Sequence, residues 1–207
     1  MLFRSGAASK ISITNLGKDV INAQVRIFKW VQVDGENQLL PTRDVVASPP
    51  AMKIQAGRKA TIRVVRLTKT PAAAEESYRL IVDEIPPPPR SANAAVALTV
   101  RHNLPVFFGP RGGASDLSWR AVVNKGQLRI VASNAGSRHS KLSELAVVSG
   151  SGKRISIADG LAGYVLSGAS NQWRAKAKSI AVGSTIRIVA KGTDGPVEAT
   201  VQVQAAN

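Results

Sequence analysis

Short segments in which apolar and polar residues alternate recur along almost the whole chain. In one of them Ile62 and Val64 alternate with Thr61 and Arg63. A period of two is typical of a β-strand that buries one face. This pattern, or a run of β-branched and aromatic residues, predicts strands at 10–15, 20–33, 60–67, 76–85, 94–108, 117–124, 127–133, 141–149, 154–157, 179–190 and 197–204.

Turn-forming residues separate these strands, for example Asn15-Leu16-Gly17-Lys18 and Asn124-Lys125-Gly126. Short strands with regular turn signals predict an all-β chain of sandwiches, and 207 residues suit two of them. The junction is expected at Pro110–Gly113, which gives an N-terminal domain of residues 1–110 and a C-terminal domain of residues 111–207. The one helical-looking stretch, 72–76, is at most a single turn.

Composition adds three exclusions. A hydrophobic share of 44% is enough for a packed core and argues against a disordered chain. No run approaches the ~20 apolar residues of a membrane-spanning helix, so no integral membrane segment is expected. The chain has no cysteine, which excludes disulfides, thiolate metal ligands and cysteine nucleophiles.

The net charge of +15 favours a polyanionic partner such as nucleic acid. Residues 1–110 carry +7 and residues 111–207 carry +8, and no Lys/Arg run is longer than two. Only nine residues are aromatic, although single-strand binders rely on aromatic stacking. Nucleic acid is therefore not the expected partner, and a basic sandwich that binds nucleic acid or another polyanion is the alternative function.

No catalytic constellation is visible. His102 and His139 are the only histidines, and a structural role is expected for each. The segment 150–154 resembles a phosphate-binding loop but has Val147 where the first glycine is required and Arg154 where Ser or Thr is required. Asp83 and Glu84 are adjacent on a predicted strand and so point to opposite faces. We expect no enzyme, no metal site and no cofactor.

The segment 75–110 is the most informative part of the sequence. Four prolines, residues 86–89, force an extended connection between two strands. The second strand places Val96, Leu98 and Val100 on one face. It is either an ordinary half-buried strand or an edge strand, and Pro105 favours the edge. An edge strand with an exposed apolar row can add to the sheet of another protein.

These motifs resemble those of periplasmic pilus-assembly chaperones of the chaperone–usher family, from about Phe3 to the C-terminus. Residues 78–86 are similar to that family's F1-strand signature ending in Glu-Ile-Pro-Pro, and Ala56-Gly57 with 62–64 resembles its preceding strand. Further segments resemble the archaic or alternative branch of that family in particular: 104–107, 134–136 with His139 and Leu142, and 163–166 with Trp173.

The resemblance implies two immunoglobulin-like domains in an L shape and a non-enzymatic chaperone in the periplasm. Such a chaperone captures pilin subunits with its N-terminal domain and delivers them to an outer-membrane usher. Three residues, which we call the donor row, would then enter the groove of a pilin that lacks its last strand: Val96, Leu98 and Val100. The resemblance also leaves open self-association of the free chaperone.

In that family basic side chains hold the terminal carboxylate of the pilin. The family's lysine aligns with Pro105 and is absent, and its other arginine would precede Met1, so we expect the chain to lack its natural start and signal peptide. Arg79 and Arg101 are the substitutes, with Arg4 as a third candidate, and each is alternatively a solvated strand arginine. Arg101 lies on the face opposite the donor row unless a bulge near 103–105 rotates the strand.

Overall fold

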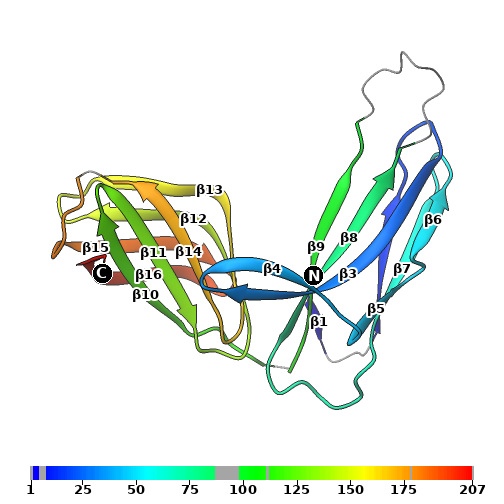
Figure 1. Cartoon of the computed structure of the whole chain (residues 1–207), viewed down its shortest axis with the longest axis horizontal. Helices are drawn as coiled ribbons and strands as arrows, with labels where there is room; N and C mark the ends of the chain where they lie inside the picture. Colours follow the sequence, from blue (N-terminus) through cyan, green and yellow to red (C-terminus); the bar gives the residue numbers. More distant parts are fainter. Residues whose placement is uncertain (1, 5–7, 87–97, 111, 178, 207) are drawn as a thin grey trace. The chain divides into compact units, whose positions relative to one another are not determined.

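The chain consists of β-strands and their connections. The computed structural model describes residues 2–4, 8–86, 98–110, 112–177 and 179–206 (Figure 1). Within these ranges we find no helix long and apolar enough to cross a membrane. The helical-looking stretch 72–76 contains no helix: residues 72–75 form a bend, and a strand begins at Glu76.

The chain divides into two compact units. One comprises Met1–Trp30 with Leu39–Arg111, and the other comprises Val31–Gln38 with Gly112–Asn207. The tip of a hairpin formed by two early strands, β3 and β4, therefore belongs with the second half of the sequence.

The first unit is built from two sheets. One sheet has the strand order β1-β9-β8-β3-β4, with β6 also paired to β3, and the other has the order β2-β7-β5. The strands are β1 (Leu2–Arg4), β2 (Ala8–Thr14), β3 (Ile21–Val33), β4 (Glu36–Pro41), β5 (Val45–Ser48), β6 (Ala51–Ile54), β7 (Lys59–Arg66), β8 (Glu76–Ile85) and β9 (Arg101–Gly109).

The core of this unit is made by the alternating apolar side chains predicted from the sequence. Ile62 and Val64 of β7 are fully buried, whereas the intervening Arg63 is exposed. They pack against the apolar faces of the other sheet in one cluster, whose buried members are Ile11, Ala23, Val25, Val45, Ile62, Val64, Tyr78, Leu80, Val82, Val106 and Phe108. Alternation with a period of two thus places one face of each strand in the core.

The second unit contains seven strands in the order β13-β12-β15-β16-β10-β11-β14. These are β10 (Leu117–Asn124), β11 (Gln127–Asn134), β12 (Ser140–Ser149), β13 (Arg154–Val165), β14 (Ser170–Lys176), β15 (Thr185–Gly192) and β16 (Gly195–Ala205). β16 pairs with β15 up to Gln202 and with β10 from Val203 to Ala205. It therefore passes from one layer to the other, and the core lies between the layers.

Several strands had not been predicted. β4 is exposed along its whole length, so its sequence shows no alternation. β5 and β6 have four residues each, which is too short for a periodic signal. β14 is mostly polar, and the strand predicted at 154–157 continues to Val165. The strand predicted at 179–190 begins only at Thr185.

The strand predicted at 94–108 begins later than expected. β9 starts at Arg101, and residues 94–97 lie outside the described part of the chain.

Each unit contains a buried asparagine that organises a turn in the same way. In the first unit the Asn15 side-chain amide donates to the carbonyl oxygens of Asp19 and Ile54 at 2.7 and 3.0 Å, and its Oδ1 accepts from the Gly17 N–H. In the second unit Asn134 donates to the carbonyls of Arg138 and Val165, and its Oδ1 accepts from the Gly136 N–H.

The two asparagines thus share one pattern, in which a glycine follows two residues later and a distant strand supplies a carbonyl. Gly136 is also required sterically, because a Cβ there would lie 2.3 Å from the carbonyl oxygen of Ala114. Both asparagines are almost fully buried, so their hydrogen bonds replace bonds to water that the turn has lost.

We predict that Asn15→Ala lowers the free energy of unfolding by about 2–4 kcal/mol, because it leaves buried backbone groups unsatisfied. Urea denaturation followed by tryptophan fluorescence measures this loss. Asn22→Ala is the matched control, since Asn22 is exposed on β3 of the same unit. Equal effects of the two substitutions would contradict the proposed role of Asn15.

Candidate functional site

Strand β9 lies near the edge of its sheet, beside β8 (Figure 1). On its other side β1 pairs only with Phe107–Gly109. Among the described residues no strand accompanies Arg101–Leu104 on that side. Within the described part of the chain, Arg101–Leu104 therefore has β8 as its one neighbouring strand.

The antiparallel register between β8 and β9 is unbroken from Glu76↔Phe108 to Asp83↔Arg101. It continues one step further, because the Glu84 N–H donates to the Val100 carbonyl at 3.0 Å. The bulge that Arg101 would need in order to share a face with the donor row is absent from these described residues. Arg101 therefore lies on the face opposite Val100.

The described donor residues are exposed to solvent. Leu98 has 91% of its surface exposed and Val100 has 52%, whereas Val106 and Phe108 on the same parity are buried. Val96 lies outside the described residues. One apolar row therefore runs out of the core of the first unit and into solvent as β9 is followed towards its N-terminal end.

Pro105 fits this arrangement without costing a hydrogen bond to β8. It lies opposite Arg79, between the positions of β9 that exchange hydrogen bonds with β8 in the register set by Val100 and Glu84. A residue at such a position directs its N–H away from β8, and proline has no N–H. A proline at this position therefore leaves the pairing of β9 with β8 intact.

Arg101 takes part in an ion-paired cluster that spans three strands. Asp83 of β8 accepts hydrogen bonds from Arg101 of β9 and, at 2.5 Å, from Arg26 of β3. These hydrogen bonds hold the pKa of the Asp83 carboxyl below its usual value, and the bond from Arg101 has the larger effect. The cluster ties the start of β9 to its neighbours, which gives Arg101 a positioning role.

Arg79 is held in a different way. Its guanidinium carbon lies 3.6 Å from the centroid of the Trp30 ring, and the ring of Trp30 lies 6.0 Å from that of Phe107. Trp30 and Phe107 are both buried. The aromatic face fixes the plane of the guanidinium by a cation–π contact, and stacking of this kind does not use the N–H edges of the group.

The three candidate anchors are spread along β9. Arg101 lies on β9 itself, Arg79 lies opposite Pro105, and Arg4 of β1 lies opposite Gly109 in the backbone register. The three positions correspond to residues 101, 105 and 109 of β9, and four residues along a strand span ~13 Å. The three positions are therefore spaced along one face of the strands and are not gathered at a single point.

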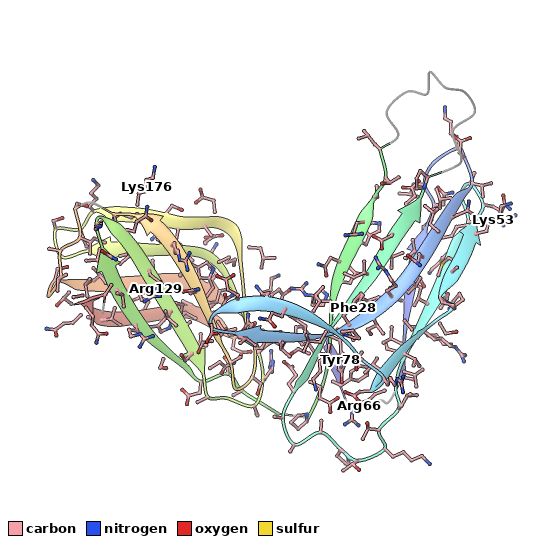
Figure 2. All side chains as sticks on the ribbon, in the orientation of Figure 1. Phe28, Lys53, Arg66, Tyr78, Arg129 and Lys176 are labelled. Carbon is pink, nitrogen blue, oxygen red and sulfur yellow. The ribbon has the colours of Figure 1, made fainter. Side chains whose placement is uncertain are left out.

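A further ionic network at the other end of β8 was not predicted. The Arg66 guanidinium donates two hydrogen bonds of 2.8 Å to the Glu76 carboxylate, and the Tyr78 hydroxyl donates to the same group at 3.1 Å. Arg66 also donates to the carbonyls of Thr68 and Thr70, so it holds the loop before β8. Figure 2 labels Arg66 and Tyr78 at this end of the unit.

The electrostatics of this network follow from its geometry. The hydrogen bonds from Arg66 hold the pKa of Glu76 below its usual value, and burial, followed by the Glu76 charge, raises the pKa of Tyr78. The network is thus built around an ionised glutamate.

Comparison with known proteins assigns the family. A sequence model described as "pili and flagellar-assembly chaperone, PapD N-terminal domain" matches residues 2–114, which is more than half of the chain. The chain belongs to this family of pilus-assembly chaperones. A chaperone family is not a class of enzymes, and a comparison with curated proteins found no match.

Solved structures of pilus chaperones have the same fold. A chain in the CsuC–CsuE chaperone–tip adhesion subunit complex of the archaic Csu pili of Acinetobacter baumannii is 24% identical, with a TM-score of 0.71 and coverage of 100% of this chain and 95% of that one. The CupB2 chaperone of Pseudomonas aeruginosa is 16% identical, with a TM-score of 0.61 and coverage of 98% and 96%.

A third match is the Salmonella enterica SafA pilin in complex with the SafB chaperone, at 17% identity and a TM-score of 0.63, with coverage of 97% of this chain and 92% of that one. At these identities the matches establish the shared fold. The prediction of an all-β chain with the immunoglobulin-like sandwiches of pilus chaperones is confirmed.

We predict that Glu76→Gln lowers the free energy of unfolding by about 1–3 kcal/mol at pH 7, because the charged hydrogen bonds to Arg66 are weakened. The folded-state pKa of Glu76 is lowered. Its contribution is therefore complete above the ordinary pKa of a glutamate and is lost as the pH falls through the folded value.

Urea denaturation of both proteins between pH 7 and pH 3 measures this effect. The difference between the wild type and Glu76→Gln should shrink as the pH falls below about 4.5. A difference that stays constant over this range would contradict the role of the ionised carboxylate.

Proposed function

We propose that this protein is a periplasmic chaperone that captures pilus subunits by donor-strand complementation and delivers them to an outer-membrane usher. In this proposal residues 1–110 form the subunit-binding domain. The segment from Val96 through β9 lends a strand to a subunit whose own sandwich lacks one.

One observation carries the proposal: β9 is an edge strand whose apolar row leaves the core and enters solvent. Leu98 and Val100 are both exposed, although they belong to the same alternating series as the buried Val106. A leucine with 91% of its surface exposed, as Leu98 has, is unfavourable in a free protein. A row of exposed apolar residues beside an unpaired strand edge marks an interaction site.

The energetics suit a capture mechanism that combines side chains and backbone. Burying an apolar side chain that is exposed in the free protein contributes ~1.5–3 kcal/mol. Leu98 and Val100 together therefore contribute several kcal/mol, part of which is offset by the ordering of both chains. The edge of Arg101–Leu104 adds backbone hydrogen bonds, which fix the register of the partner strand.

The solved structures support this proposal, because two of the similar structures contain a chaperone in complex with a partner. One complex contains a tip adhesion subunit and the other contains a pilin. We place this chain in the archaic or alternative branch on the motifs around 104–107 and 163–166.

We propose Arg79 as the residue that holds the terminal carboxylate of the subunit. Trp30 orients its guanidinium, and an oriented guanidinium binds a carboxylate with little further loss of freedom. Arg101 would first have to share its charge with Asp83, to which it is already hydrogen-bonded.

Leu98→Asp is expected to abolish capture of a cognate pilin that lacks its last strand, because it would place a charge in the apolar groove of the subunit. Co-expression followed by affinity purification measures the yield of complex. Thr99→Asp is the matched control, since Thr99 is also exposed but lies on the opposite face, and it should retain most of the complex.

Both variants should unfold at the temperature of the wild type, since residues 98 and 99 are exposed in the free protein. Unimpaired capture by Leu98→Asp, or equal loss with Thr99→Asp, would exclude the proposed donor row.

Arg79→Gln is expected to weaken binding of a subunit that ends at its natural carboxylate by roughly tenfold or more, equivalent to ~1.4 kcal/mol. It should have little effect on a subunit extended by two glycines, whose carboxylate is displaced. Isothermal titration calorimetry measures both affinities, and Arg79→Lys tests whether charge alone is sufficient.

Arg63→Gln removes the same charge from an exposed position on β7 and serves as the control. If Arg101→Gln weakens binding and Arg79→Gln does not, then the anchor is Arg101 and the assignment to Arg79 is wrong.

A further inference from the structure

The outward face of β10, β11 and β14 in the second unit is strongly basic. Along these strands the apolar side chains point into the core, so the residues between them face solvent. Four cationic side chains occupy these positions and all are exposed: Arg120, Arg129, Arg174 and Lys176. Figure 2 labels Arg129 and Lys176 on this sheet.

Two of these cations face each other directly. Arg129 of β11 and Arg174 of β14 are register partners, so their Cβ atoms are ~5 Å apart. Like charges at directly opposite positions destabilise a sheet. A neighbouring carboxylate would relieve this repulsion, but within the described part of the chain neither arginine has an ion-pair partner.

Most acidic residues of the second unit lie away from these three strands. Residues 112–207 contain five, and none is on β10, β11 or β14. Asp34 and Glu36, at the tip of the β3–β4 hairpin, lie closer, since Gln172 of β14 donates to the Glu36 carboxylate at 3.1 Å. Three of the five are already paired with other cations, namely Glu144 with Lys191, Asp194 with Arg138 and Glu198 with Arg187. Among the described residues no carboxylate forms an ion pair with Arg129 or Arg174, although Asp34 lines a depression together with Arg129.

The paired arginines line a surface depression of about 300 Å³ that also contains neutral hydrogen-bond donors. Asn124 and Gln127 contribute side-chain amides, and Val122, Leu128 and Ala206 complete the lining. None of these lining residues has a carboxylate side chain. The neighbouring depression on the same face contains Arg120 and Arg129 but also Asp34, so it is less suited to an anion.

We infer that Arg129 and Arg174, together with Asn124 and Gln127, form a binding site for a phosphate group. Two guanidinium forks bracket a tetrahedral phosphate group more completely than they do a planar carboxylate, because the oxygens of a phosphate do not lie in one plane and can be approached from two sides. The amides supply donors without adding charge. The phosphate belongs either to the free inorganic ion or to the head group of an anionic lipid.

Binding is tested with two probes at matched ionic strength: inorganic phosphate in calorimetry, and vesicles of phosphatidylcholine with or without phosphatidylglycerol in co-sedimentation. The double variant Arg129→Gln/Arg174→Gln should bind at least tenfold more weakly than the wild type. Arg154→Gln/Arg187→Gln is the control, because it removes two exposed arginines from other strands of the same unit.

Saturable binding of inorganic phosphate that only the first double variant loses supports the site and identifies the free ion as a ligand. Loss confined to the phosphatidylglycerol vesicles supports the site and identifies the lipid head group. Equal loss in both double variants, no loss in the first, or no binding of either probe by the wild type overturns the inference.

Thermal unfolding distinguishes a ligand site from a structural role of the two arginines, because the two roles predict changes of opposite sign in the unfolding temperature. Without phosphate, the Arg129→Gln/Arg174→Gln protein should unfold at the same temperature as the wild type or higher, because repulsion is relieved. A lower unfolding temperature than that of the control variant would show that the arginines support the fold, and would count against a ligand site.

Discussion

The unbroken antiparallel pairing of β8 with β9 is the constraint on which the rest of the first unit depends. Because side chains alternate along a strand, one register decides at once which residues enter the core and which face solvent. Here it buries Val106 and Phe108 at one end and carries the same row out to Val100 and Leu98 at the other. A slip of one residue would exchange the two faces, so that Pro105, Phe107 and Gly109 would replace Val106 and Phe108 in the core and the exposed apolar row would turn away.

The same register separates the basic residues that a sequence comparison groups together. Arg101 faces away from Val100 and is held by Asp83, whereas Arg79 lies four positions further along β8 and is held by Trp30. One arginine orders the start of the strand, and the other presents an oriented guanidinium. The pairing of β8 with β9 thus gives different surroundings to two arginines that look equivalent in the sequence.

Amphipathic strands could be predicted from the sequence because burial on one face leaves a periodic signal, as in Ile62 and Val64 of β7. β4 and β14 could not, since an exposed or polar edge strand is stabilised by backbone pairing that any side chain permits. The Arg66–Glu76 pair was also missed, because a loop closes between the two residues and nothing periodic relates them. In the site, the row of Leu98 and Val100 was readable from alternation. The partners of the two arginines were not, because Trp30 reaches Arg79 from β3, a distant part of the sequence, and Asp83 reaches Arg101 only through the pairing of β8 with β9.

Charge shows most clearly what strand pairing adds to a sequence. The +15 is divided almost evenly between the two halves and contains no basic run, so along the chain it looks dispersed. Once β11 pairs with β14, Arg129 and Arg174 become direct neighbours, and three acids of the same unit are paired with other cations. Like charges at directly opposite positions repel each other, and among the described residues neither arginine has an ion-pair partner. A bound oxyanion would offset this repulsion, which is why the positions of the charges in the folded sheet, rather than their number, indicate the chemistry of a ligand.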